Sequence, residues 1–458
     1  MAHKRAYYWY MENSEVHHNG TVRMKEKLRI FFTKGLQKAL MTIELFGKNE
    51  LANHAAAGAY GFLLSAAPVF IMAAILITRA FGAWPEWVTS LVGEIELLAS
   101  NFDIEVSLRD ILDTKRIGIP ALITGINLLW TARVFALSLQ RGTRTVFLTI
   151  ERPSILRENT LTFLIEIAVV FYAMAYAVSS RLTLSVVRRA GIFLQLPILD
   201  PALELISLLL PIAGLGILTW LAYRLIPFEH PSAKAALRGS ILCVGLYSLV
   251  SFGFRELIDI TRYNLLYGTL GNLLILLANV YFFFIFFYWG AQYAFVEDSF
   301  DELSFQHYRR VSHVSASPGP LERRVFSKPK KLMQNYARLI ADGEYLYQCG
   351  DNAEVVFYIV RGVVSILRMD ASGKEIEDSF IREGGFVGET EVLLEQKRTT
   401  SAQARGETHV LGLPPELFQR VLHTDPESAL HVIEDLSKRV NRLVPPEVPV
   451  DPDSDRDL

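Results

Sequence analysis

Long apolar runs alternate with polar segments between residues 55 and 295 of the sequence. A helix needs about 20 mostly apolar residues to cross the hydrocarbon core of a bilayer. Six runs come near that length, so the pattern predicts a polytopic α-helical membrane domain with six transmembrane helices. We place these helices at Ala55–Ala80, Ile117–Ser138, Thr160–Ser179, Ala202–Ala222, Ala236–Phe254 and Gly271–Phe295.

Lys and Arg are unevenly distributed among the segments that flank these runs. The chain before the first run and the loops 139–158 and 223–235 are rich in basic residues, whereas the intervening loops contain fewer or dilute them with acidic residues. Since short cytoplasmic loops carry an excess of Lys and Arg, both termini of this multi-pass chain should be cytoplasmic. The even number of spans agrees, and it places the chain after Val296 in the cytosol.

The first 50 residues mix basic and apolar positions, most regularly over Thr21–Phe46. This pattern predicts an amphipathic helix that lies along the inner headgroup region, with a plain cytosolic helix as the alternative. We therefore expect a cytosolic N-terminus with an interfacial helix at 1–50 and a six-span membrane domain at 51–298.

Ionisable residues inside the predicted spans are informative because each costs about 2.5–3.5 kcal/mol at the bilayer centre. Arg133 in the second span and Glu166 in the third lie at similar depth near the cytoplasmic side, so they are candidates for an ion pair. His54 begins the first span at the same level. These three residues are candidates for an intramembrane polar pathway. Alternatively, the pair only ties two helices together, Arg133 extends to the headgroups, and His54 is a packing residue.

The sequence pattern changes after Ala294. Segment 299–334 is polar and basic, which predicts a linker. Short β-prone runs punctuated by glycine follow, and helical periodicity then returns, which predicts a cytosolic β-roll or jelly-roll domain with flanking helices at 335–444. Residues 445–458 form an acidic tail that we expect to be disordered. The expected elements are strands at Tyr345–Tyr347, Val355–Val360, Val363–Arg368, Glu375–Ile381, Ser401–Arg405 and His409–Leu413, and helices at Glu416–Leu422 and Ser428–Leu443.

Composition supports a membrane protein and argues against several other classes. The hydrophobic fraction of 51% and the mean hydropathy of +0.26 are high for a soluble enzyme of this size. The net charge of −2 offers no basic excess for nucleic acid. Two cysteines, Cys243 and Cys349, cannot build a zinc cluster. Because no nucleophile–base pair or metal-ligand cluster can be assembled, we expect no enzymatic activity, no catalytic residues, no metal and no cofactor.

The membrane half resembles the YihY/BrkB family of bacterial inner-membrane proteins. The resemblance rests on the six spans, the basic lead-in and the small-residue run Ala55–Pro68, and it covers about residues 25–300. It implies a location in the bacterial inner membrane, contact with membrane lipids, and a transporter-like or envelope role. It supplies no catalytic residues.

A second group of residues suits the binding of a cyclic phosphate. Gly388 and Glu389 open a predicted short helix, Arg398 follows ten residues after the glycine, and Thr399 and Thr400 come next. Backbone N–H groups at a helix start favour phosphate, and a guanidinium can pair with it through two hydrogen bonds. A carboxylate can accept a ribose hydroxyl. This spacing predicts one pocket for all of these groups.

These residues and the runs Asp342–Asp351 and Val356–Ile366 closely resemble the cyclic nucleotide-binding domain of catabolite-activator proteins, nucleotide-dependent kinases and gated channels. The resemblance covers about residues 335–443. It implies that cAMP or cGMP is a regulatory ligand, and the choice between them stays open. Taken with the YihY/BrkB resemblance of the membrane half, it predicts a six-span membrane domain joined to a nucleotide sensor.

The resemblance also implies a role for each residue of the pocket. Glu389 would bind the ribose 2′-hydroxyl, Arg398 the cyclic phosphate, and Gly388 and Thr399 would complete the phosphate site beside Thr400. The sequence departs from the family pattern in two places. Glu391 stands where a small residue is usual, and Lys397 stands where proline often precedes the arginine.

Together these patterns predict a transporter-like inner-membrane protein that is regulated by a cytosolic cyclic nucleotide. One alternative is a nucleotide-gated channel, although the sequence has no selectivity-filter or voltage-sensor pattern. Another alternative is a non-transporting, membrane-anchored sensor or scaffold. Expected partners are membrane lipids and the nucleotide, with a homo-oligomer left open. No nucleic acid is expected, because no DNA-binding pattern follows the domain.

Overall fold

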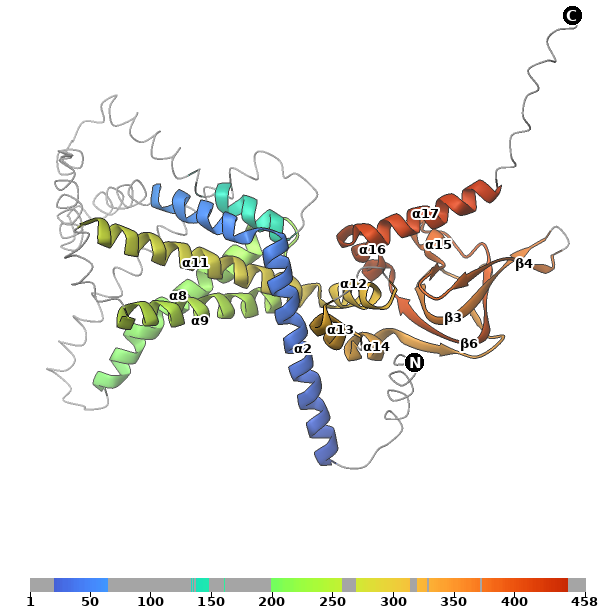
Figure 1. Cartoon of the computed structure of the whole chain (residues 1–458), viewed down its shortest axis with the longest axis horizontal. Helices are drawn as coiled ribbons and strands as arrows, with labels where there is room; N and C mark the ends of the chain where they lie inside the picture. The colour runs from blue at the N-terminus through green and yellow to red at the C-terminus, as the bar shows by residue number, and fades with distance from the viewer. Residues whose placement is uncertain are drawn as a thin grey trace, which may run out of the picture. The chain divides into compact units, whose positions relative to one another are not determined.

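The computed structural model describes residues 20–64, 133, 135, 137–147, 160, 199–257, 269–313, 319–327, 329–370 and 373–443. The chain divides into two compact units (Figure 1). We call Lys38–Asp298 the helical unit, and Met1–Gln37 together with Ser299–Leu458 the sheet unit. Each unit is described below by itself.

Three long helices form the centre of the described part of the helical unit. They are α8 (Leu199–Leu225), α9 (Ala233–Leu257) and α11 (Thr269–Asp298), and α9 packs against both of the others (Figure 1). A Cβ atom added to Gly239 would lie 2.4 Å from the carbonyl oxygen of Gly290, and one added to Gly290 would lie 2.5 Å from that of Gly239. The backbones of α9 and α11 therefore touch, as small residues permit in membrane helix pairs.

Two of the described helices are long and apolar enough to cross a membrane. These are Ala233–Gly253 and Leu274–Asp298, and the apolar stretch Leu209–Leu225 is shorter. The first two overlap the fifth and sixth predicted spans, and α8 contains the fourth. The first three predicted spans lie mostly outside the described residues, so the number six stays a prediction.

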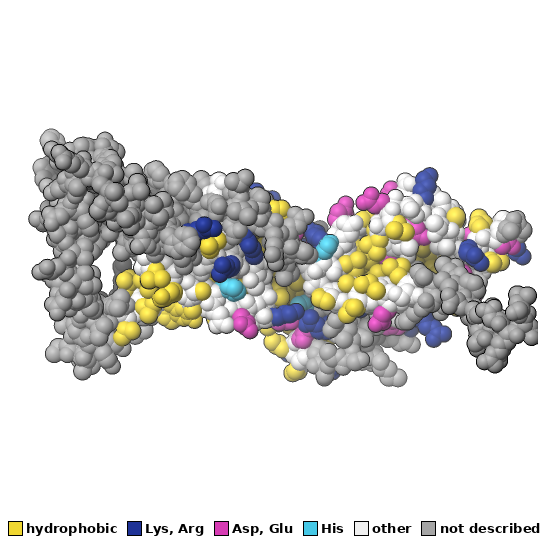
Figure 2. Space-filling view, turned by 90° about the horizontal axis from the view of Figure 1, so that it is seen from above, with side chains coloured by type: hydrophobic (Ala, Val, Ile, Leu, Met, Phe, Trp, Pro, Cys, Tyr) yellow, Lys and Arg dark blue, Asp and Glu magenta, His cyan; other side chains and the backbone are white. Residues whose placement is uncertain are grey.

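Apolar side chains also remain exposed on these helices, and Figure 2 shows them gathered on the surface of the helical unit. Outward faces of this kind suit a hydrocarbon environment better than water. The most exposed of these side chains are Ile217 at 59%, Ile241 at 63%, Phe252 at 65% and Leu249 at 68%.

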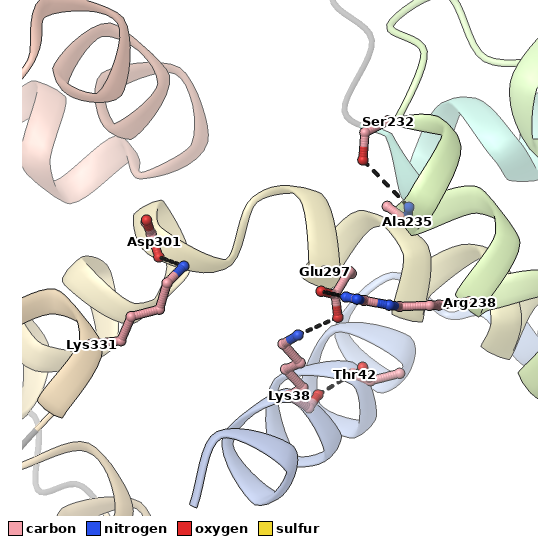
Figure 3. Close-up of polar contacts among 8 residues, drawn as sticks. All are labelled: Lys38, Thr42, Ser232, Ala235, Arg238, Glu297, Asp301 and Lys331. Carbon is pink, nitrogen blue, oxygen red and sulfur yellow. Dashed lines mark hydrogen bonds and ion pairs between the residues drawn. The ribbon is translucent and has the colours of Figure 1, made fainter. Parts of the chain in front are cut away.

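A carboxylate at the end of α11 joins three helices of the helical unit. Glu297 forms ion pairs with Lys38, from helix α2 (Gly20–Lys48), and with Arg238 of α9 (Figure 3). The side chains of Glu297 and Lys38 are only 10% and 7% exposed. Because an unpaired buried charge is strongly unfavourable, this cluster ties the start of the unit to the ends of α9 and α11.

The sheet unit is built on one antiparallel sheet (Figure 1). The path β1-β6-β3-β4 forms the sheet, while β2 pairs with β6 and β5 pairs with β3. Its strands are β1 (Ala337–Ile340), β2 (Tyr345–Tyr347), β3 (Val356–Met369), β4 (Glu375–Arg382), β5 (Phe386–Val387) and β6 (Ser401–Leu413). Its helices, besides the start of α2, are α12 (Phe300–His313), α13 (Pro320–Phe326), α14 (Lys330–Tyr336), α15 (Glu389–Leu393), α16 (Pro415–Thr424) and α17 (Pro426–Leu443).

The sheet confirms the predicted antiparallel domain with C-terminal helices, but two pairs of expected strands are each a single long strand. Val355–Val360 and Val363–Arg368 merge into β3, and the last two expected strands merge into β6. The pairing of β3 with β6 shifts register around Arg361 and Gly362. Gly362 has φ +111°, so it forms a bulge that bends the strand without ending it. The sequence analysis instead ended one expected strand before this bulge and began the next one after it.

Alternate residues of β3 face two hydrophobic clusters, as the pleat of a strand requires. Tyr358 packs in the cluster that also holds Phe386 and residues of the helices, whereas Phe357 and Ile359 pack in the other with Tyr347. Both clusters reach the end of the sheet where α15 begins. The sheet core therefore supports the segment that carries the predicted phosphate site.

The segment predicted as a linker, 299–334, contains three helices in the structure. Phe305 of α12 is fully buried, with its ring centroid 5.1 Å from that of Tyr358 and 6.2 Å from that of Phe386. Only Ser299 separates the end of α11 at Asp298 from the start of α12 at Phe300. The sheet unit is thus connected to α11 by a helix that belongs to its own hydrophobic core. The predicted domain boundaries stay predictions.

Candidate functional site: a cassette around Arg398

A left-handed glycine begins the short helix α15. Gly388 has φ +78° at the N-cap of the helix, a conformation that favours glycine. A Cβ atom at this position would lie 2.4 Å from Nη1 of Arg398 and 3.0 Å from Cε1 of Tyr347. Both the backbone conformation and the lack of space require glycine here. The close approach brings the guanidinium against the start of the helix.

Arg398 lies inside the domain and is only 3% exposed. Its Nη1 donates a hydrogen bond of 2.6 Å to the carbonyl oxygen of Gly388, and its Nη2 donates to the carbonyl oxygen of Val355. The guanidinium carbon lies 4.2 Å from the centroid of the Tyr347 ring, within the range of a cation–π interaction. Nε has no hydrogen-bond partner among the described residues. The buried guanidinium is therefore held in a fixed orientation, and its Nε–H can still donate a hydrogen bond.

The backbone on either side of this arginine is clamped by the loop after β2. The N–H of Gly350 donates to the carbonyl oxygen of Arg398 at 2.8 Å, and the N–H of Arg398 donates to that of Asp351 at 2.9 Å. The N–H of Cys349 donates to the hydroxyl of Ser401 at 3.1 Å. These bonds fix the position of the arginine before any ligand enters.

A second carboxylate, in addition to that of Glu389, lies inside this cassette. Oε1 of Glu391 accepts a hydrogen bond of 2.6 Å from the hydroxyl of Thr399 and a longer one, 3.4 Å, from its backbone N–H. Oε2 of Glu391 lies 3.7 Å from Nη1 of Arg398, and Glu391 is 6% exposed. The residue flagged as a departure from the family pattern is therefore the counter-ion of the predicted phosphate-binding arginine.

Tyr347 provides the aromatic wall of the cassette. Burial is the main reason that its pKa is raised to about 12, and the negative charge of Glu391 adds to the effect. The phenol is therefore neutral at physiological pH. It can donate a hydrogen bond while its ring faces the guanidinium.

The structure brings together all five residues of the predicted nucleotide site. Gly388 and Glu389 begin α15, and Arg398, Thr399 and Thr400 lead into β6. Glu389 is 1% exposed, Thr400 is half-buried and Thr399 is exposed. Their roles in binding a nucleotide stay predictions.

Sequence reasoning did not identify two further components of the cassette, the Tyr347 ring and the Val355 carbonyl. An aromatic residue at the end of a strand is ordinarily core, so the Tyr347 position alone gave no signal. The Val355 contact is made by the backbone, which leaves no mark in the sequence. Glu391 did give a signal, as a charged residue where a small one is usual.

The residues of the predicted polar pathway are described only in part. The ring of His54 lies in the helical stretch 51–64, with Nε2 3.4 Å from the hydroxyl oxygen of Thr145. Arg133 is helical and its side chain is exposed. Glu166 lies outside the described residues. The proposed pair of Arg133 and Glu166 therefore stays a prediction.

Replacing Gly388 with alanine should weaken nucleotide binding roughly tenfold, because the new Cβ displaces the guanidinium. A non-glycine residue at positive φ should also cost about 1–2 kcal/mol of stability. Gly373 is a matched control, since it has the same φ of +78° with nothing within 4 Å of an added Cβ. Thermal unfolding and nucleotide titration of both variants separate the two effects. Equal loss of affinity in Gly373→Ala would contradict the assignment.

Two transcriptional regulators are similar to about a fifth of the chain. The cAMP-activated global transcriptional regulator CRP of Salmonella typhimurium is 28% identical over 92 residues, which is 20% of this chain and 44% of the relative. The Global nitrogen regulator of Synechococcus elongatus is 32% identical over 100 residues, 21% of this chain and 45% of the relative. The chain thus spans less than half of the length of these relatives.

Solved structures with similarity to the chain include a catabolite activator protein and an enzyme in a cAMP-bound form. The Thermus thermophilus catabolite activator protein is 22% identical with a TM-score of 0.24, covering 29% of this chain and 59% of that one. An EAL enzyme in its cAMP-bound form is 20% identical with a TM-score of 0.20, covering 23% and 28%.

Two family models match the chain, one in each half, and both agree with the resemblances found in the sequence. Residues 337–425 match the family described as Cyclic nucleotide-binding domain, which includes the whole cassette. Residues 42–309, more than half of the chain, match the family described as Virulence factor BrkB. The chain therefore belongs to the BrkB family and carries, after its BrkB membrane domain, a cyclic nucleotide-binding domain.

Proposed function

We propose that this protein is a transporter-like protein of the bacterial inner membrane whose activity is controlled by cAMP or cGMP. In this proposal six helices cross the membrane and both termini are cytoplasmic. The nucleotide binds in the cytosol and acts as a regulatory ligand, and the chain is not an enzyme. Its partners are membrane lipids and the nucleotide, with no nucleic acid.

The cassette supports a cyclic nucleotide as the ligand. Arg398 is a buried cation, and guanidinium groups of this kind bind phosphate through charge-assisted hydrogen bonds. Glu389 begins α15 next to it and would accept a ribose hydroxyl. Relatives named for activation by cAMP match 92 residues of the chain, and residues 337–425, which include the cassette, match the Cyclic nucleotide-binding domain family. A phosphate and a sugar hydroxyl on one rigid ring would meet both groups at once.

The observation that carries the regulatory part of the proposal is the position of α12. This helix begins one residue after α11 ends, and its buried Phe305 contacts Phe386, two residues before Gly388. A rearrangement of α15 around a ligand would therefore act on a helix that is covalently continuous with an apolar, span-length helix. Only Ser299 lies between the two helices.

Polar contacts connect α12 to the C-terminal helices as well. Arg309 donates to the hydroxyl of Ser428 in α17, and its Nη1 lies 3.5 Å from Oδ2 of Asp425. Glu302 of α12 pairs with Arg420 of α16. A ligand that prefers one arrangement of these helices would shift the equilibrium by its difference in affinity for the two arrangements.

Reconstitution in liposomes tests the proposal. Purified full-length protein and its Arg398→Ala variant would be assayed for transfer of labelled phospholipids and a panel of small solutes, with cAMP, cGMP or 5′-AMP added. We expect at least one flux that changes several-fold with a cyclic nucleotide in the wild type alone. Nucleotide binding without any dependent flux would contradict transport and favour a sensor or scaffold. Nucleotide-gated single-channel currents in planar bilayers would favour a channel instead.

A further inference from the structure

Glu391 occupies an unusual place for a charged side chain. It is the third residue of α15, only 6% exposed, and its carboxylate points into the cassette toward the segment that carries Arg398. A buried carboxylate requires compensation by hydrogen bonds or an opposite charge. Glu391 has both, from Thr399 and from Arg398.

The groups that compensate Glu391 are those that a cyclic phosphate would need. The Thr399 hydroxyl lies 2.6 Å from Oε1, the Thr399 N–H lies 3.4 Å from it, and Nη1 of Arg398 lies 3.7 Å from Oε2. A carboxylate and the exocyclic oxygens of a phosphodiester are both anionic pairs of acceptors. They therefore compete for the same donors.

Charge balance makes simultaneous occupation unfavourable. With Glu391 in place, the carboxylates of Glu389 and Glu391 are both buried in the cassette, and Glu391 already pairs with the Arg398 guanidinium. Lys397 is exposed to solvent. A cyclic phosphate would add another negative charge at close range in a partly buried site, where like charges repel strongly.

We propose that Glu391 is an internal competitor of the ligand, occupying the phosphate position until a cyclic nucleotide displaces it. This inference rests on the proposed function and deepens it. Glu391 sets the affinity of the sensor, because the free energy of its own contacts is lost when the nucleotide binds. The domain then responds only to a high concentration of nucleotide, and the nucleotide-free state keeps its buried arginine neutralised.

The neighbourhood allows the carboxylate to leave. Thr399 is exposed, and so are Leu393 at the end of α15 and the loop 394–397 that leads to Arg398. Rotation of the Glu391 side chain toward this loop would return it to water without repacking either hydrophobic cluster. Val392, the residue that anchors α15 in the core, need not move.

The test is a titration of the purified full-length protein in lipid nanodiscs with cAMP and with cGMP. We expect Glu391→Ala to bind at least one of them tenfold or more tightly than the wild type, and Glu391→Gln at least threefold more tightly. Glu395→Gln is the matched control, because it removes an exposed negative charge from the neighbouring loop. It should change affinity less than twofold. Thermal unfolding checks that each variant is folded, and Glu391→Gln carries the test if Glu391→Ala is not.

The outcomes separate this inference from the proposed function. Equal affinity in the wild type and both Glu391 variants, with binding lost in Arg398→Ala, would overturn the competitor role and leave nucleotide sensing intact. An equal gain in Glu395→Gln would also overturn it, because the effect would then be general electrostatics. Absence of binding in every variant would overturn both. A gain confined to Glu391 variants and abolished by adding Arg398→Ala supports both.

Discussion

Replacing Arg398 with alanine is expected to abolish cyclic nucleotide binding by the full-length protein. Removing one partner of a buried charge pair costs roughly 2–5 kcal/mol, which corresponds to a loss of roughly 30-fold to several thousand-fold in affinity. Arg398 is 3% exposed and supplies the guanidinium of the cassette. Isothermal titration with cAMP and cGMP measures the effect.

Arg405 provides the control for this experiment. It lies on β6, the strand that follows the cassette, but its side chain is 56% exposed and pairs with Glu377. Arg405→Ala should leave affinity unchanged. Arg398→Lys adds a second test, because a lysine keeps the charge but not the planar pair of donors; it should bind with intermediate affinity. Undiminished binding by a folded Arg398→Ala variant would remove Arg398 from the site.

Replacing Gly290 with valine should severely destabilise the helical unit. An added Cβ would lie 2.5 Å from the carbonyl oxygen of Gly239, 2.6 Å from the Tyr223 hydroxyl and 2.9 Å from Cys243 Cβ. The helices α9 and α11 must therefore separate, and overpacking of this kind costs about 1–3 kcal/mol or more. We place Gly290→Val at the upper end of that range, since the neighbour is backbone and cannot rotate away.

Gly245 of α9 is the matched control, because nothing lies within 4 Å of an added Cβ there. Gly245→Val should unfold close to the wild type. The measurement is thermal unfolding of the purified protein in detergent, followed by circular dichroism. Equal stability of Gly290→Val and Gly245→Val would contradict the close contact between α9 and α11.

The proximity of Gly388 and Arg398 followed from the sequence because the ten residues between them form one short helix and one loop. The assignment of this segment to a nucleotide site came from the resemblance of the whole domain, and the roles of the individual residues stay predictions. Tyr347 and the Val355 carbonyl reach the arginine from more than 40 residues away. No local pattern indicates such a contact, because it depends on how β2 and β3 are placed in the sheet.

The consequence of Glu391 also required the structure. The sequence showed only a charged residue at a position where a small one is usual. It could not show that the carboxylate contacts Thr399 and Arg398, since a side chain on a five-residue helix can point in several directions. The contacts of Glu391 with Thr399 and Arg398 are what lead to the proposal that Glu391 competes with the phosphate of the ligand.

Helix and strand boundaries illustrate the same limit. Apolar length located α11, which is mostly hydrophobic, and also α9, although the apolar run of α9 contains several Gly and Ser residues. Gly362, in contrast, was taken as the end of a strand, and only pairing with β6 shows that the strand continues through a bulge. The burial of Phe305 likewise could not be predicted from the polar segment 299–334. It depends on contacts with Tyr358 and Phe386 of the sheet unit and not on its neighbours in the chain.

If a cyclic nucleotide bound at the cassette acts on the membrane domain, its binding should change hydrogen–deuterium exchange beyond the cassette. The measurement is exchange of the full-length protein in nanodiscs, with and without saturating cAMP or cGMP. We expect slower exchange over residues 386–402 together with altered exchange in α12 and α11, all absent in Arg398→Ala. Exchange that is unchanged by either nucleotide, or that changes in the cassette but not in α12 and α11, would contradict it.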